Sequence, residues 1–418
     1  MPAGCGVEVG PATSALIVDH FTMKIPLLDL KAQYRTIEGE MRQAIDEVLE
    51  SQQFVLGPTV KRFEEQAVAY LQCGAAIGVA SGSDALLLSL MALGIGAGDA
   101  VLVPPFTFFS TVSSITRLGA TPIFVDIEPG SCLLDVKKVE ALLEERCRPH
   151  PDGQGLMESK TQRRIRAVLP VHLFGQCCSM APLVAIAQRY HLRIVEDVAQ
   201  AFGARAPLAP GVAKPAGTIG DLGCFSFFPT KNLGGMGDGG LVTSNQQELA
   251  DKVRMLRVHG ENSKYHHQEI GLNSRLDAIQ AAVLMVKLRH IDQWCEERIE
   301  RARLYQSLFS ATGLVGNQII SLPSLSSGKG HVFNCYVIRV RQRDALKRYL
   351  DEQGIQTEIY YPLPLHLQPC FFHLGGRRGD FSNSEQAASQ VLALPMYPEL
   401  PLEQQEMVVE EIKNFYRQ

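Results

Sequence analysis

The stretch CFSFFPTKN at residues 224–232 is followed at once by LGGMGDGG at residues 233–240. It places Lys231 directly after an apolar, aromatic run and before a glycine-rich turn, which is an unusual position for a solvated surface charge. Burial lowers the pKa of a lysine, and a partly desolvated lysine can form a Schiff base. The structural alternative is a lysine at a strand end that extends its ammonium group to water.

A second segment, SGSDA at residues 81–85, stands between an apolar run and a helical pattern. Free backbone N–H groups at a helix start form an anion site, where Gly82 permits close approach and Ser83 adds a hydroxyl donor. An ordinary helix cap explains the same residues, because Ser and Asp are preferred there. Both interpretations remain open on the sequence.

A third segment, IVEDVAQ at residues 194–200, ends an apolar strand with two carboxylates, Glu196 and Asp197. α/β folds place their ligands at the carboxyl ends of strands. A buried acid there is costly unless a partner compensates it, and a protonated pyridine nitrogen would be such a partner. An Asp197 that caps the following helix is the alternative.

Short apolar runs alternate with helical patterns from about residue 45 to residue 290. This alternation predicts an α/β fold with a mostly parallel sheet between helices. We expect a large domain over residues 23–295, whose N-terminal segment can pack on a smaller α+β domain over residues 296–418. A long helix at about 274–300 leads out of the large domain. Two polar stretches rich in Pro and Gly, 148–163 and 206–217, are predicted to be loops.

Composition bounds the function. The chain has 418 residues, enough for two domains, with 40 Lys+Arg against 44 Asp+Glu and a net charge of −4. This charge gives no electrostatic footprint for nucleic acid. The ten cysteines contain no C-x-x-C pair, which favours reduced thiols in a cytoplasm. No run of about 18 apolar residues predicts a membrane span. Residues 1–22 lack a signal-peptide pattern and are predicted to be a tail.

Taken together, the three segments resemble the DegT/DnrJ/StrS-type sugar aminotransferases. That family has the fold type I of pyridoxal-phosphate (PLP) transferases, in the aspartate aminotransferase superfamily. The similarity runs from IPLLDL at residues 25–30 to PM at 395–396, almost the whole chain. Further motifs occur in the family's order at residues 54–63, 105–111, 170–176, 271–282 and 361–369.

The resemblance implies that PLP is the cofactor and that Lys231 forms the Schiff base and then moves protons as general acid and base. It implies that Asp197 pairs with the pyridinium nitrogen, which keeps the ring an electron sink. The other implied contacts are Gly82, Ser83 and Ser226 at the phosphate, Phe108 stacked on the ring, Gln200 near the phenolic oxygen, and Asn273 at the phosphate of the neighbouring subunit. The protein would therefore be a homodimer with shared active sites.

The implied reaction takes an amino group from glutamate to a nucleotide-linked keto sugar, in the synthesis of polysaccharide or glycan precursors. The segment YYPLPLHLQP at 360–369 resembles members that aminate C3, and we expect Tyr361 and His366 to contact the substrate. Many relatives carry histidine where this sequence has Tyr360, so the sequence does not decide the identity of the sugar. Arg275 is placed to pair with the carboxylate of a UDP-linked 3-keto hexuronate, or else belongs to a subunit interface. A dTDP-linked 3-keto-6-deoxyhexose is the rival substrate.

Other candidates have structural explanations. His172, at a predicted strand end, lines the site or is a satisfied core histidine. The adjacent His266 and His267 make a poor metal pair without further ligands, so no metal site is predicted. The neighbours Cys177 and Cys178 are expected to be packing residues.

The sequence argues against three rival classes. Sugar dehydratase relatives carry a histidine in place of the lysine, whereas Lys231 is present here. A regulatory or scaffold protein would have little use for Lys231, Asp197 and Gln200 together. A dinucleotide-binding enzyme would need a G-x-G-x-x-G after an early strand, and the sequence has none there.

Overall fold

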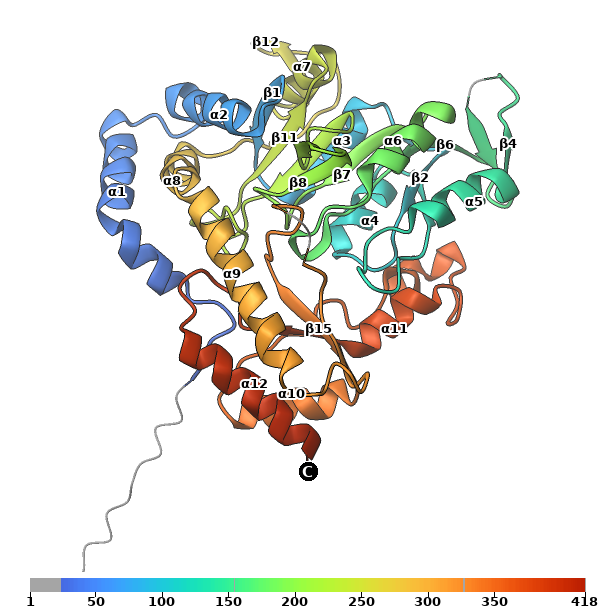
Figure 1. Ribbon diagram of the computed structural model, residues 1–418. Coiled ribbons are helices and arrows are strands. Elements are labelled where there is room, and N and C mark those ends of the chain that lie inside the picture. The colour runs from blue at the N-terminus through green and yellow to red at the C-terminus, as the bar shows by residue number, and fades with distance from the viewer. Residues whose placement is uncertain (1–23, 154, 326–327, 418) are drawn as a thin grey trace, which may run out of the picture.

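The computed structural model describes residues 24–153, 155–325 and 328–417 (Figure 1). The predicted tail at 1–22, together with Met23, lies outside the described residues. Figure 1 shows two parts. One is a large sheet with its covering helices, and the other is a smaller group of helices and strands from the C-terminal end of the chain.

The main sheet has the strand order β1-β11-β10-β7-β6-β2-β3. The pairs from β10 to β3 are parallel, whereas β11 runs antiparallel to both β1 and β10. The prediction of a mostly parallel sheet is confirmed. The strands are β1 (Ala75–Val79), β2 (Asp99–Val103), β3 (Thr121–Phe124), β6 (Arg163–Val168), β7 (Arg193–Asp197), β10 (Leu222–Ser226) and β11 (Gly240–Ser244). Every residue of β1 and β11 is buried, as expected for strands covered on both faces.

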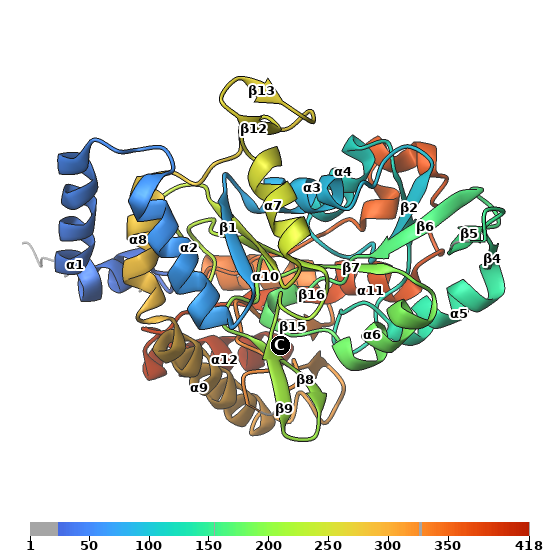
Figure 2. The same cartoon turned by 90° about the horizontal axis from the view of Figure 1, so that it is seen from above.

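Helices cover both faces of this sheet. Figure 2 shows α3, α4 and α7 on one side and α5 and α6 on the other. The covering helices are α2 (Gly57–Leu71), α3 (Gly82–Ala92), α4 (Phe109–Arg117), α5 (Val136–Arg146), α6 (Met180–Arg189) and α7 (Gln247–Leu256). At one edge of the sheet, α2 packs on the edge strand β1.

The single long helix predicted over 274–300 is wrong. The structure has α8 (Ala278–Leu288) and α9 (Ile291–Ser310), and α8 packs against α1 (Leu30–Ser51). The N–H groups of Arg289 and His290 reach carbonyls three residues back instead of four, which tightens the last turn and ends α8. Along α9, Trp294 and Cys295 pack in the core of the large domain, and Ile299 begins the core of the small one.

The small domain combines three antiparallel strands with three helices. Its elements are β14 (Ile320–Ser321), β15 (Tyr336–Val340), β16 (Val391–Leu394), α10 (Arg343–Glu352), α11 (Ser382–Gln390), α12 (Leu402–Arg417) and the 3-10 turns η2 (Leu365–Leu367) and η3 (Pro369–Leu374). The N-terminal segment packs here, because Ile25 pairs with Ile355 and is fully buried in this core.

The two predicted loops are instead hairpins. β4 (Cys147–Pro149) pairs with β5 (Leu156–Glu158), which extends the main sheet by pairing with β6. β8 (Arg205–Ala209) pairs with β9 (Val212–Pro215), and Gly211 supplies the positive φ of the turn. A third hairpin, β12 (Glu261–Ser263) with β13 (His266–His267), stands out from the body in Figure 2.

Two features of the described residues bear on function. None of their helices is both long and apolar enough to span a membrane. Among the same residues, no three His, Cys, Asp or Glu side chains gather in a way that would hold a metal ion.

Candidate active site

A cavity of about 780 Å³ lies between the carboxyl ends of the parallel strands and the small domain. It brings together most of the residues that the sequence predicted for the site. Those that line it are Gly82, Ser83, Phe108, Asp197, Gln200, Ser226, Lys231 and Tyr361. Residues far apart in the chain thus meet at one edge of the sheet.

Lys231 reaches the cavity because the chain turns sharply after β10. Its own N–H donates to the carbonyl of Phe228 at 2.9 Å, and the turn continues through Gly234, where a Cβ would lie 2.4 Å from the carbonyl oxygen of Pro229. Burial lowers the pKa of Lys231, and the nearby Cys335 and Asp197 only partly oppose this. A lowered pKa favours the neutral amine, the form that attacks a carbonyl.

Asp197, at the end of β7, is 4% exposed. One carboxylate oxygen accepts from the Thr111 hydroxyl at 2.9 Å, and the other accepts from the Ala199 N–H at 3.1 Å. Burial raises the pKa of Asp197, although these two bonds and the positive charge of Lys231 act against it. The carboxylate therefore faces the cavity in an environment that a cationic partner would stabilise.

The start of α3 forms a tight cradle. Ser81 caps the helix by accepting from the Asp84 N–H at 3.1 Å, so the cap and the anion site predicted from the sequence occupy the same turn. Gly82 has no room for a side chain, since a Cβ would lie 2.6 Å from Cβ of Ser226. The hydroxyl of Ser83 lies 2.6 Å from that of Ser110. Helix N–H groups and several hydroxyls thus converge as donors for an anion.

Aromatic and amide groups form the remaining wall. The ring of Phe108 is 58% exposed where it borders the cavity. Gln200 donates from Nε2 to the Tyr361 hydroxyl at 3.2 Å and accepts from the Phe174 N–H at 2.7 Å. Tyr361 and Phe174 both have left-handed φ, +64° and +58°, and their rings stack at 6.4 Å. Strained backbone of this kind is typical of functional sites, where the surrounding structure enforces it.

Sequence reasoning named neither Ser110 nor Thr111 as site residues. Both begin α4 next to the predicted Phe108, and Ser110 lines the cavity. The sequence does carry a signal for Thr111. It follows Thr107 by four residues, a spacing that brings two side chains together on a helix, and their hydroxyls lie 3.0 Å apart.

Three predicted residues lie elsewhere. Asn273 is exposed and pairs with Val258 in an isolated bridge, and neither Asn273 nor Arg275 lines the cavity of its own chain. His366 is fully buried, and its Nε2 lies 3.1 Å from a carboxylate oxygen of Glu385. The predicted contact of His366 with substrate is therefore not supported: the 3-10 turn η2 directs this ring against Phe124 and Phe381, on the core of the main sheet.

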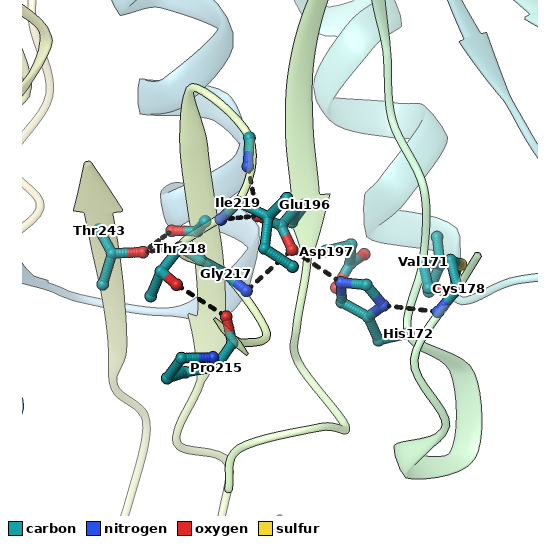
Figure 3. Close-up of polar contacts among 12 residues, drawn as sticks. Val171, His172, Cys178, Glu196, Asp197, Pro215, Gly217, Thr218, Ile219 and Thr243 are labelled. Atoms are coloured by element: carbon teal, nitrogen blue, oxygen red, sulfur yellow. Dashed lines mark hydrogen bonds and ion pairs between the residues drawn. The ribbon is translucent and has the colours of Figure 1, made fainter. Parts of the chain in front are cut away.

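His172 and Glu196 do not line the cavity either. Figure 3 shows the two side chains turned toward each other. Both are fully buried and lie 3.0 Å apart, so His172 is a satisfied core histidine. Cys178 is buried beside it, with its thiol donating to the carbonyl of Val171 at 3.0 Å. The carboxylate that faces the cavity is thus Asp197, although Glu196 precedes it in the sequence.

These groups make different chemical demands on a ligand. A partly buried lysine suits an aldehyde, a buried carboxylate suits a basic ring nitrogen, and a helix start suits a phosphate. Pyridoxal phosphate carries all three, and the glycine-lined cradle and the buried carboxylate fit it. The fold and the site therefore define a PLP-dependent transferase of fold type I.

Comparison with known proteins gives the family. The profile of the DegT/DnrJ/EryC1/StrS aminotransferase family matches residues 35–413, and the chain belongs to this family. It is similar to the dTDP-3-amino-3,4,6-trideoxy-alpha-D-glucose transaminase of Streptomyces venezuelae, with 39% identity over 94% of this chain and 97% of the relative. The Geobacillus stearothermophilus protein named pleiotropic regulatory protein is 45% identical, over 94% of this chain and 99% of that protein.

Comparison with solved structures supports the same family. The crystal structure of S. venezuelae DesV in complex with a ketimine intermediate has a TM-score of 0.85 and 39% identity, over 94% of this chain and 99% of that one. The protein is thus a PLP-dependent aminotransferase.

Proposed function

We propose that this aminotransferase moves an amino group from glutamate to C3 of a nucleotide-linked 3-keto sugar, with UDP or dTDP as the nucleotide. The observation that carries the proposal is the meeting of Lys231 and Asp197 in one cavity of about 780 Å³, which extends beyond them to Tyr361 and the small domain. The Streptomyces relative, whose name states a dTDP-linked 3-amino sugar, supports the substrate class.

When bound, PLP supplies an electron sink for the charge that develops at the reacting carbon. Asp197 keeps the ring nitrogen protonated, because a buried carboxylate stabilises a cation in contact with it. Gly82, Ser83 and Ser226 bind the phosphate through the cradle at the start of α3. Phe108 would cover the ring, and Gln200, which donates to the Tyr361 hydroxyl, would approach the phenolic oxygen.

Lys231 performs the proton transfers. Its lowered pKa leaves the amine free to take a proton from the α-carbon of glutamate. In the second half of the reaction the same group delivers a proton to C3 of the sugar. Among the described residues no hydrogen bond or ion pair restrains Nζ of Lys231, so the side chain is free to move between these positions.

We further propose a homodimer in which Asn273 and Arg275 reach the cavity of the partner subunit. Both lie outside the cavity of their own chain. The adjoining hairpin projects from the body. Tyr265 in its turn and Ile270 after β13 are 80% and 93% exposed, and exposed apolar side chains of this kind suit a protein contact. We place the protein in a cytoplasm, since the described cysteines are all free thiols.

A regulatory role without catalysis is the second candidate, because the Geobacillus relative bears a regulatory name. Catalysis is favoured by a specific observation. Lys231, Asp197 and Gln200 all line one cavity, and a protein without chemistry would have no need for a partly buried, unpaired lysine with a lowered pKa there.

The test is a screen of UDP- and dTDP-linked 3-keto and 4-keto sugars with glutamate, following 2-oxoglutarate. We expect turnover with 3-keto substrates and none with Lys231→Ala. Arg275→Ala separates the rival sugars, since it should lower the rate with a hexuronate much more than with a 6-deoxyhexose. The absence of 2-oxoglutarate with every sugar, from protein that carries PLP on Lys231, would overturn the proposal in favour of the regulatory role.

A further inference from the structure

Behind the reactive end of β7, a buried carboxylate joins separate parts of the chain (Figure 3). One oxygen of Glu196 accepts from the N–H groups of Ile219 and Gly220, at 2.8 Å and 2.7 Å. The other accepts from the Gly217 N–H at 2.9 Å and lies 3.0 Å from Nε2 of His172. Burial by itself raises the pKa of Glu196, but these bonds outweigh it and hold the pKa below its usual value. The group is therefore a fully satisfied anion.

The protonation of His172 follows from its partners. The Cys178 N–H donates to Nδ1 at 3.0 Å, so Nδ1 carries no proton, and Nε2 must be the donor to Glu196. The backbone N–H of His172 donates to the carbonyl of Asp197 at 2.9 Å. One histidine thus holds the side chain of Glu196 and the backbone of the next residue, Asp197.

The segments that Glu196 joins all lead to the cavity. The turn at 217–220 opens into β10, whose end carries Ser226 and then Lys231. Neighbouring residues of a strand point to opposite faces, so Glu196 faces away while Asp197 faces the cavity. A buried carboxylate must be compensated by its hydrogen bonds to be tolerated at all, and apolar residues would stabilise this region as well, which favours a role of Glu196 in setting geometry.

We infer that the His172–Glu196 pair is a positioning unit, which sets the place of the Asp197 carboxylate relative to Lys231. The inference rests on the proposed roles of those two residues at the cofactor. His172 and Glu196 do not line the cavity, so they act only through the backbone of β7 and of the turn at 217–220.

Two substitutions of His172 separate its contacts. In His172→Gln, the amide nitrogen occupies the place of Nε2 and can still donate to Glu196. In His172→Asn, the shorter side chain can accept from the Cys178 N–H but leaves Glu196 without its fourth donor. Thr243→Val is the matched control. It removes the bond of 2.5 Å from the Thr243 hydroxyl to the carbonyl of Gly217, which loosens the same turn without touching Glu196.

The measurements are the PLP dissociation constant, the pH titration of the bound-cofactor absorption, and the melting temperature of the cofactor-free protein. We expect His172→Asn to raise the PLP Kd at least about tenfold, the effect of losing one charge-assisted hydrogen bond. Its absorption titration should shift in the same direction as that of Asp197→Asn. His172→Gln should retain nearly native values, and Thr243→Val should lower the melting temperature while leaving Kd nearly unchanged.

The inference is overturned if Kd simply follows the loss of melting temperature in all three variants, or if His172→Asn and His172→Gln bind PLP alike. Should His172→Asn fail to fold, Glu196→Gln makes the same comparison. Its amide nitrogen would face two hydrogen-bond donors and could accept from neither, which disrupts the pair. An unchanged Kd would again overturn the inference. Borohydride trapping of PLP on Lys231 in the native protein is measured first. Its failure would refute the proposed function, whereas normal trapping with control-like variants refutes only the positioning role.

Discussion

Replacing Asp197 by asparagine removes a charge from the site while keeping its shape. The Ala199 N–H can still donate to the amide oxygen, and the Thr111 hydroxyl, which also contacts Thr107, can turn to accept from the new amide nitrogen. The fold should therefore persist. The second amide hydrogen would point at the ring nitrogen of the cofactor, which stabilises the unprotonated ring instead of the pyridinium.

The size of the effect follows from the burial of Asp197, which is only 4% exposed. At an effective dielectric constant of about 20, two unit charges about 4 Å apart attract by about 4 kcal/mol. The new hydrogen bond recovers part of this. We therefore expect the barrier to rise by at least about 2.7 kcal/mol, which slows the reaction at least about a hundredfold.

The assay is single-turnover conversion of PLP-loaded protein by glutamate, read from cofactor absorbance, with Glu196→Gln in parallel. Asp197→Asn should still bind PLP, because the cradle and Lys231 remain. Glu196→Gln should be impaired less in this step, since Glu196 does not reach the cavity. If Asp197→Asn reacts at nearly the native rate while Glu196→Gln is inactive, the wrong carboxylate has been assigned to the cofactor.

Three further predictions test other parts of the site. Lys231→Ala should abolish borohydride fixation of PLP to the chain, and trapping that persists at this cavity would contradict the role of Lys231. Gly82→Ala should raise the PLP Kd at least about tenfold, because its Cβ would lie 2.6 Å from Cβ of Ser226 and must distort the cradle; native affinity would exclude phosphate binding there. Mixing Lys231→Ala with Asn273→Ala protein should restore activity, because hybrid dimers contain one site with both residues intact. No recovery despite verified subunit exchange would argue against a shared site.

The sequence predicts the reactive core of the site because its signals are local. An apolar run that ends in a lysine, and another that ends in two carboxylates, mark strand ends without reference to the rest of the chain. Parallel strands bring their carboxyl ends to one edge, so Lys231 and Asp197 were expected to meet. Gly82 followed from the same reasoning, since a helix start after a strand lies at that edge too.

Contacts that depend on side-chain direction in irregular segments were beyond such reasoning. His366 lies in a 3-10 turn, where one residue of difference in register decides between the cavity and the core. The bond between Gln200 and Tyr361 depends on the left-handed backbone at Tyr361, an unusual conformation for a tyrosine.

The two hairpins mistaken for loops show another limit. Their proline and glycine content is typical of loops, yet β5 is fixed by pairing with the distant strand β6. The break between α8 and α9 has no proline or glycine to mark it. Residues on both sides of it pack on the same core, and a last turn of α8 with hydrogen bonds three residues back ends the helix.

The central claim is that Lys231 and its cofactor carry nitrogen from glutamate to a nucleotide-linked keto sugar. The most direct measurement is mass spectrometry of the sugar product after incubation of PLP-loaded protein with [15N]glutamate and a 3-keto nucleotide sugar. The account predicts a 15N-labelled amino sugar and an equal amount of 2-oxoglutarate from the native protein, and neither from Lys231→Ala. An unlabelled product, or labelled product formed equally well by Lys231→Ala, would contradict it.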